Sequence, residues 1–140
     1  MSEQLIRAYR RTLFRVFDLD GEFVMRIDVP CPELLRCHAR HGVSSSCFIT
    51  AWNPASVEQP PAVNAAAQER LRRAITEGGY PMIEGHGEDP DSEWTPEASL
   101  LVLGIDETGA RRFGQEFGQL AIVVAGPDAT PRLVWLGSEN

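Results

Sequence analysis

The stretch SLLVLGI, residues 99–105, is apolar at nearly every position and decides the class of fold. A continuous apolar run of this length, bounded by polar residues, is typical of a strand buried on both faces. A second run rich in β-forming residues, SCFITAW at 46–52, stops at Asn53-Pro54, because proline cannot donate a ladder hydrogen bond. We therefore expect two central strands in one sheet.

The segments around these strands predict an α+β fold. Residues 61–77 carry an apolar stripe at helical spacing that Gly78-Gly79 closes, and Asp106 is placed to cap a last helix that runs to about residue 117. Residues 80–83 and 119–125 predict two more strands. The order strand, helix, strand, strand, helix, strand over about residues 46–125 is that of a ferredoxin-like split βαβ core.

Both ends of the chain add elements to this core. Residues 2–11 predict a short helix, and residues 13–17 and 23–27, separated by an Asp-Gly turn, predict a β-hairpin. Pro32 opens another helix, which Gly42 ends, and residues 131–136 predict a C-terminal strand. No repeat or long linker divides residues 1–140, so we expect a single domain.

Composition excludes several classes of function. The chain has 140 residues, of which 43% are hydrophobic, enough for a core without disulfides or metal. Its net charge is −7 and all 13 positive residues are arginine, which excludes a Schiff-base lysine and a phosphate-loop lysine. The acidic balance argues against nucleic acid and anionic membranes as partners.

The N-terminus has no apolar signal segment, and no apolar run is long enough to span a membrane. Three cysteines without CxxC spacing predict reduced thiols in the cytoplasm, and no cofactor is expected.

The segment 84–97 is the most acidic in the chain, and we expect it to be a long solvated loop. Its spacing Asp89-x-Asp91-x-Glu93 imitates the first ligands of a calcium loop. The imitation fails because Trp94 stands where glycine is required and Leu100 where the closing glutamate belongs. A metal site is therefore the weaker alternative, and its ligands would be His86, Asp89, Asp91 and Glu93.

The polar residues at the ends of the predicted strands form the strongest candidate for a functional site. If the two central strands are adjacent and antiparallel, the end of the first lies beside the start of the second, and the polar groups of both converge. A pocket with a few converging polar groups and aromatic walls is the usual form of a ligand site. The candidate ligand-binding residues are Thr50, Trp52, Asn53, Asn64, Trp94, Glu97, Ser99 and Gln119. The structural alternative is that asparagine and serine cap turns here, with Glu97 accepting backbone hydrogen bonds.

No complete catalytic set is present. A Gly-x-Ser-x-Gly elbow is missing, and Cys47 lies in an apolar strand where a thiol packs as a small apolar group. An enzymatic alternative, a small hydrolase, assigns Glu97 as general base and His86 as acid or metal ligand, with Asn53 orienting the substrate. His41 lies close to Cys37, but helix C-terminal electrostatics explain histidines there without metal.

Three strings of the sequence resemble a known protein family. FITAWNP at 48–54, Glu97-x-Ser99 followed by LLVLGI, and FGQLAIV at 117–123 are similar to the signatures of a bacterial "domain of unknown function" family of small one-domain proteins. Leu120 departs from that pattern, since relatives often carry asparagine there. The resemblance implies no reaction, ligand or cofactor.

Our leading hypothesis is a small domain that binds a small molecule or a protein through the Trp52/Asn53/Glu97 edge. Because an exposed edge strand invites pairing, a homodimer formed through residues 133–136 is a further alternative.

Overall fold

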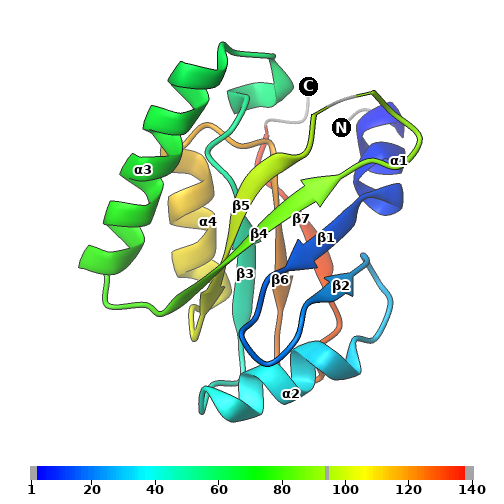
Figure 1. The fold of residues 1–140 in the computed structure, drawn as a ribbon, viewed down its shortest axis with the longest axis vertical. Helices are drawn as coiled ribbons and strands as arrows, with labels where there is room; N and C mark the ends of the chain where they lie inside the picture. Colours follow the sequence, from blue (N-terminus) through cyan, green and yellow to red (C-terminus); the bar gives the residue numbers. More distant parts are fainter. Residues whose placement is uncertain (1–2, 94, 138–140) are drawn as a thin grey trace.

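The computed structural model describes residues 3–93 and 95–137, which form four helices, one short 3-10 helix and seven strands (Figure 1). In chain order these are α1 (Glu3–Arg11), β1 (Leu13–Val16), β2 (Phe23–Met25), α2 (Pro32–Arg40), β3 (Ser46–Ile49), η1 (Pro54–Ser56), α3 (Pro61–Glu77), β4 (Met82–Glu88), β5 (Glu97–Leu103), α4 (Glu107–Glu116), β6 (Ala121–Ala125) and β7 (Arg132–Trp135). The predicted α+β class is confirmed.

All seven strands belong to one sheet, in the order β2-β1-β4-β5-β3-β6-β7, and every neighbouring pair is antiparallel. The two strands predicted to be central, β3 and β5, lie side by side with Ile49 opposite Leu100. The predicted N-terminal hairpin extends the sheet beyond β4, and the C-terminal strand extends it beyond β6. The sequence therefore identified the two strands on which the rest of the sheet is built.

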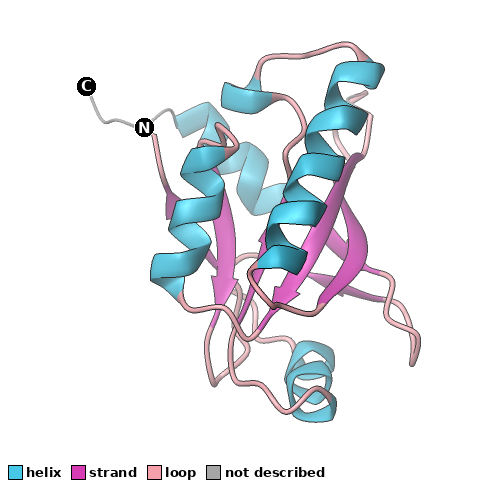
Figure 2. Ribbon diagram, turned by 90° about the vertical axis from the view of Figure 1, so that its left-hand side faces the viewer, coloured by secondary structure: helices cyan, strands magenta, loops and turns pink. Residues whose placement is uncertain are grey.

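Helices α3 and α4 lie next to each other on one face of the sheet (Figure 2). Their buried side chains pack against the outward-facing residues of the central strands, so that Leu71 and Ile75 of α3 share a core with Leu100 and Val102. Asp106 caps α4 as predicted, because its Oδ1 accepts a hydrogen bond from the Gly109 amide over 2.8 Å.

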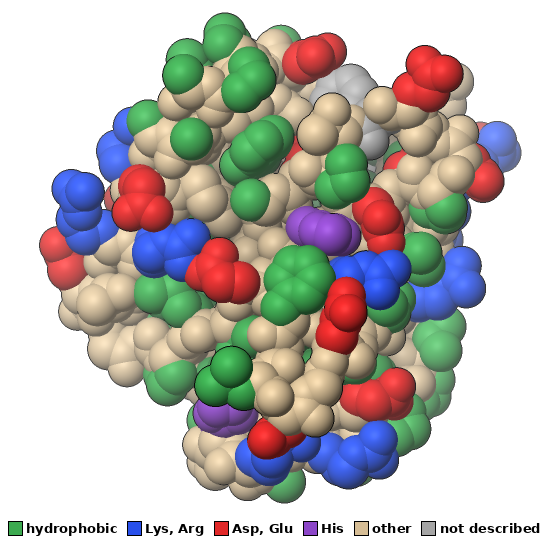
Figure 3. Space-filling model, in the orientation of Figure 1, with side chains coloured by type: hydrophobic (Ala, Val, Ile, Leu, Met, Phe, Trp, Pro, Cys, Tyr) green, Lys and Arg blue, Asp and Glu red, His purple; other side chains and the backbone are tan. Residues whose placement is uncertain are grey.

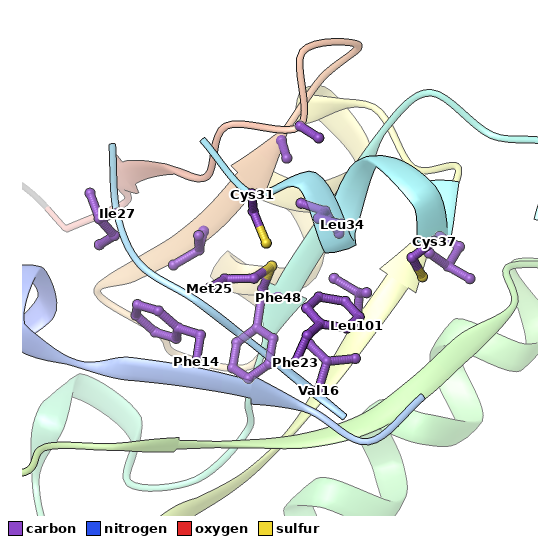
Figure 4. Packing of buried hydrophobic residues seen from close by; sticks show 14 residues of the cluster. Phe14, Val16, Phe23, Met25, Ile27, Cys31, Leu34, Cys37, Phe48 and Leu101 are labelled. Carbon is purple, nitrogen blue, oxygen red and sulfur yellow. The ribbon is translucent and has the colours of Figure 1, made fainter. Parts of the chain in front are cut away.

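The sheet curls around a second core on its other face. Phe14 of β1 and Phe48 of β3 meet edge to face there, with ring centroids 5.3 Å apart (Figure 4). Helix α2 contributes Leu34 to this core. The Asp28 amide donates to the Pro131 carbonyl over 2.7 Å, which connects the segment after β2 to the residue before β7 and draws the two ends of the sheet together.

Two predicted boundaries are wrong. The strand expected over residues 46–52 ends at Ile49, since the backbone beyond it bonds to side chains of α3 rather than to a neighbouring strand. The segment 84–97 is not a long loop, because β4 continues through Glu88 and β5 begins at Glu97. Gly85 and Gly87, at alternate positions in the second half of β4, obscured its alternation in the sequence.

The same register explains Gly85. A Cβ on Gly85 would lie 2.3 Å from the carbonyl oxygen of Arg15 and 3.0 Å from the Phe48 ring, so this position excludes every larger residue. None of the helices in residues 3–93 and 95–137 has the length and apolar character that a membrane crossing requires.

Candidate functional site

The predicted convergence of polar residues at the ends of β3 and β5 is confirmed. Thr50 Oγ1 donates to the Ala98 carbonyl over 2.7 Å, and Asn53 Nδ2 donates to Glu97 Oε1 over 2.9 Å. The two strand tips are therefore joined by side-chain bonds just beyond their last ladder pair.

Asn53 is the centre of a buried hydrogen-bond network. Its amide nitrogen donates to Asn64 Oδ1 over 2.9 Å, and its Oδ1 accepts from Asn64 Nδ2 over 2.8 Å and from the Gln59 amide over 3.0 Å. One turn further along α3, Gln68 Oε1 accepts from the Ala51 amide over 2.9 Å. These side chains replace the ladder partners that the backbone loses where β3 ends. Asn53 and Asn64 therefore stabilise the loop after β3, as the structural alternative predicted. The same network also holds the Glu97 carboxylate in one orientation.

The loop after β3 has an unusual backbone. Asn53, Ala55 and Ser56 have φ angles of 45°, 57° and 59°, all in the left-handed region. Asparagine tolerates this region, whereas a left-handed alanine costs about 1–2 kcal/mol. The Ala55 amide donates to the Gly118 carbonyl over 2.8 Å, which fixes the loop against the turn before β6. Strain of this kind persists only where the surroundings hold it, and it concentrates at functional sites.

A cavity of about 340 Å³ opens beside this loop, between α1 and the concave face of the sheet. Figure 1 shows α1 lying next to β1 and to the connection between β4 and β5. Apolar walls come from Leu5 and Ala8 of α1 and from Phe14, Phe48 and Val123 of the sheet. This volume lies at the lower end of the range of ligand pockets, about 300–1,000 Å³.

Four of the eight predicted site residues line this cavity, namely Thr50, Glu97, Ser99 and Gln119. Three others, Trp52, Asn53 and Asn64, line a second hollow of about 520 Å³. Trp94 lies outside the described residues. The predicted edge is thus divided between two hollows, and Glu97 belongs to the cavity under α1.

Tyr9 is a cavity residue that the sequence reasoning missed. It comes from α1, and burial raises the pKa of its hydroxyl above the ordinary value of 10.0, with the charge of Glu97 acting in the same direction and a hydrogen bond with Ser56 opposing. Its helical spacing with Leu5 and Ile6 indicates a short helix and nothing more. No local signal links α1 to the end of β3 or to the start of β5, which lie far along the chain.

The rim of the cavity is closed by an ion pair between α1 and the segment after β4. Both oxygens of Asp89 accept from Arg11 Nε over 2.9 Å, and this bond holds the pKa of the Asp89 carboxyl below its usual value. Asp89 Oδ1 also accepts from the Asp91 amide over 3.0 Å. The carboxylate considered as a calcium ligand is therefore occupied by a guanidinium and a turn.

His86 and Glu97 lie on opposite faces of the sheet. Glu97 pairs with Gly87 across the ladder, whereas His86 pairs with Ala98 and Arg15, and successive residues of a strand point in opposite directions. The His86 ring packs edge to face on Phe17, with centroids 5.1 Å apart, and its Nε2 lies 3.8 Å from Glu88 Oε2. The acid and base roles assigned to this pair require one shared face, so this part of the hydrolase hypothesis is wrong.

The surface in the orientation of Figure 1 shows acidic and basic side chains interleaved around a histidine, without a separate basic patch (Figure 3). Arg15 donates to Glu88 over 2.7 Å, and Arg72 contacts both Glu69 and Glu84. On this face the charges neutralise one another locally.

Among the described residues, one group of potential metal ligands lies within 4.8 Å, formed by Asp18, Cys37 and His41. Arg40 contacts Asp18 Oδ2, and burial together with the Asp18 charge raises the pKa of the Cys37 thiol to about 11. A cation would have to compete with the guanidinium and displace a tightly held proton. The arrangement is that of a hydrogen-bonded cluster that fixes the β1–β2 turn to the end of α2.

Residues 49–122 match the family described as "Protein of unknown function (DUF3293)". The chain belongs to the DUF3293 family. This confirms the resemblance to a family of unknown function, and the matched DUF3293 region begins at the end of β3 and includes all eight predicted site residues. A search of the curated proteins found no match, and neither did a search of the solved structures. For this DUF3293 protein, function must be argued from the site itself.

Proposed function

We propose that this protein binds a small molecule in the cavity between α1 and the concave face of the sheet. The observation that carries the proposal is the cavity of about 340 Å³, with apolar walls and the Glu97 carboxylate among its polar residues. Largely apolar pockets with a few precisely placed polar groups are the usual form of ligand sites.

The arrangement of the polar groups supports this proposal over a purely structural role. Asn53 holds Glu97 through a hydrogen bond of 2.9 Å, and Asn53 itself is fixed by Asn64 and Gln59. A carboxylate held by two layers of hydrogen bonds is preorganised, which reduces the cost of ordering it when a ligand binds. The strained backbone of residues 53–56 lies beside the cavity, which Ser56 lines.

A fragment screen by protein-observed NMR on the full chain tests the proposal. We expect hits to shift the backbone amides of Tyr9, Gly87, Ser99 and Gln119, all of which line the cavity. Hits that shift only residues of the opposite helical layer, or no hits at all, would overturn it.

A matched pair of variants makes the test specific. Ala8 lines the cavity from α1, so Ala8→Trp should fill the cavity and abolish the shifts. Ala66 is exposed on α3, and Ala66→Trp should leave them unchanged. Thermal unfolding of both variants shows whether they fold; if Ala8→Trp does not, Leu5→Phe, also on the α1 wall, takes its place.

The finer features of the fold are also part of the proposal. The strand order β4-β5-β3-β6, with α3 and α4 on one face, supports a ferredoxin-like unit over about residues 46–125 within one domain. Three buried, free cysteines support a reducing compartment such as the cytoplasm. β7 is an edge strand, so homodimer formation through it remains a prediction that sedimentation analysis tests.

A further inference from the structure

The charged side chains that line the cavity under α1 are all bonded within the protein. They are Arg11, Glu88, Asp89 and Glu97. Arg11 Nε donates to both oxygens of Asp89 over 2.9 Å, and Arg15 donates to Glu88 over 2.7 Å. Glu97 accepts from Asn53 over 2.9 Å and has a further interaction within the chain. In the described part of the lining, a charged ligand therefore finds no unbonded side chain of opposite charge.

The apolar walls of the cavity make this lack of a partner costly for an ion. Leu5, Phe14, Phe48 and Val123 surround the polar groups. In such surroundings an ion without a partner loses its hydration and gains little in return, which costs far more than burying a neutral polar group. An ion that takes a partner from an existing pair leaves another charge unpaired. The cavity therefore disfavours ligands of either charge.

The uncharged polar groups of the lining are mainly hydroxyls. They belong to Tyr9, Thr12, Thr50, Ser56, Ser92 and Ser99, and the amide of Gln119 is the other such group. Thr12, Thr50 and Ser99 donate to the backbone carbonyls of residues 8, 98 and 97 over 2.6 Å, 2.7 Å and 2.9 Å. A hydroxyl that has donated its hydrogen keeps its lone pairs, so these three side chains can still accept.

Tyr9 and Ser56 add donor capacity to the lining. These two hydroxyls bond to each other, which uses one of their two hydrogens and leaves the other to donate. Burial raises the pKa of the Tyr9 hydroxyl, so it keeps its proton at neutral pH. The lining can therefore both donate hydrogen bonds to an uncharged group and accept them from it.

We infer that the ligand is a small uncharged molecule with a hydroxyl group on an apolar body, such as an aromatic alcohol. This inference rests on the proposed function and specifies the ligand class for the same cavity. A hydroxyl both donates and accepts, which matches a lining that does the same. The apolar body packs against Phe14 and Phe48, whose rings meet edge to face in the wall.

Three probes of nearly equal shape test the inference, namely benzyl alcohol, benzylamine and benzoate, which are neutral, cationic and anionic at pH 7. Each is titrated into the full chain, and the amide shifts of the cavity residues are followed by NMR. Benzyl alcohol should bind at least about tenfold more tightly than either ion, because each ion gives up hydration without gaining an opposite charge.

Two substitutions in the ion pair test why ions are disfavoured. Asp89→Asn leaves Arg11 without its carboxylate, so the affinity for benzoate should rise by at least about threefold relative to benzyl alcohol. Arg11→Gln leaves Asp89 without its guanidinium, so benzylamine should gain by a similar factor. Taking the ratio to benzyl alcohol cancels any change in how α1 is held.

The second ion pair of α1 supplies the matched control. Arg10 Nη1 lies 2.9 Å from Asp28 Oδ2, and neither residue is among the described residues that line the cavity. Asp28→Asn and Arg10→Gln make the same changes of charge on the same helix. Both variants should leave the ratios of the three affinities as they are in the wild type.

Tyr9→Phe tests the hydroxyl part of the inference. The variant keeps the aromatic wall and removes one hydroxyl, so benzyl alcohol should bind about threefold to tenfold more weakly while toluene, which has no hydroxyl, binds as before. Tyr80→Phe makes the same change where Tyr80 packs on Phe113 in the helical layer, and should affect neither probe.

The outcomes separate the ligand class from the binding function. If benzylamine or benzoate binds in the wild-type cavity as tightly as benzyl alcohol, or if other fragments bind there and benzyl alcohol does not, the ligand class is wrong and the binding function stands. Unchanged ratios in Asp89→Asn and Arg11→Gln, or unchanged binding of benzyl alcohol to Tyr9→Phe, also overturn the ligand class alone. If no probe and no fragment shifts a cavity residue, both proposals fail.

Discussion

Asn53 Nδ2 donates to Glu97 Oε1 across 2.9 Å, which joins the loop after β3 to the first residue of β5. The Oδ1 of the same side chain accepts from Asn64 and Gln59 at the start of α3. One buried amide thus connects a strand, a helix and the carboxylate of the cavity. Its removal should affect both the stability of the fold and the orientation of Glu97.

Replacing Asn53 with alanine should lower the free energy of unfolding by about 2–4 kcal/mol. The change removes the side-chain acceptor of the buried Asn64 Nδ2 and of the Gln59 amide, at a cost of about 1–3 kcal/mol. It also places alanine in the left-handed region, at φ 45°, which asparagine tolerates better than alanine does. Urea unfolding measures the sum of the lost hydrogen bonds and the backbone strain.

Asn53→Gly separates these two contributions. Glycine loses the same hydrogen bonds but adopts the left-handed backbone freely, so it should be more stable than Asn53→Ala by up to about 1 kcal/mol. Equal stability of the two variants would show that the backbone at residue 53 is not strained.

Ala55→Gly should raise the stability of the protein by about 0.5–1 kcal/mol. Ala55 has φ 57° and ψ 24°, where alanine pays about 1–2 kcal/mol and glycine does not, although glycine loses more entropy on folding. Ala65→Gly, at an exposed position within α3, is the control and should destabilise by about 1 kcal/mol. If Ala55→Gly raises the free energy of unfolding while Ala65→Gly lowers it, the loop is strained at Ala55. If both variants are less stable than the wild type, it is not.

The sequence predicts those parts of the fold whose signals are local and periodic. Residues 61–77 form a helix with the bounds that the apolar stripe and the flanking proline and glycines indicated. The pairing of β3 with β5 followed from their shared apolar character and from the order of the elements. The polar residues at the ends of those strands could then be placed together from the sequence alone.

The cavity could not be predicted, because it depends on where α1 packs. Tyr9 and Glu97 are 88 positions apart, and no pattern along the chain brings them together. The extent of β4 was predicted too short for a different reason. Gly85 and Gly87 face the concave side, and at Gly85 the Arg15 carbonyl and the Phe48 ring leave no room for a Cβ. The strand therefore shows charged and polar residues alternating with glycines rather than with apolar residues.

Gly85 and Gly87 should respond very differently to alanine. A Cβ at Gly85 would overlap the Arg15 carbonyl at 2.3 Å, so Gly85→Ala should destabilise by about 2 kcal/mol or more through backbone displacement. At Gly87 the nearest atoms are 3.7 Å and 3.9 Å away, so Gly87→Ala should fold with nearly unchanged stability. Because Gly87 lines the cavity, its variant should still weaken the binding of fragments in the NMR titration. Tight binding to a stable Gly87→Ala protein would place the ligand elsewhere.

The ion pair between Arg11 and Asp89 should make the attachment of α1 sensitive to acid. Arg11 holds the pKa of Asp89 below 3.8, so the folded protein binds this proton more weakly than the unfolded chain does. The stability that the pair contributes is therefore fully present above the unfolded pKa and is lost as pH falls through the folded pKa. Its size at neutral pH should be small, since Arg11 is partly exposed and water screens the pair.

Asp89→Asn provides the measurement. Asparagine keeps the acceptor for the Asp91 amide but cannot titrate, so the difference in unfolding free energy between wild type and variant should shrink as pH falls from 5 to 3. Asp18 and Glu107 also have lowered pKa values, because each contacts arginine, but they titrate in both proteins and cancel in the difference. Since the pair closes the rim of the cavity, hydrogen exchange in α1 should accelerate in Asp89→Asn at neutral pH. A difference in stability that stays constant from pH 7 to pH 3 would mean that Arg11 does not hold α1 through Asp89.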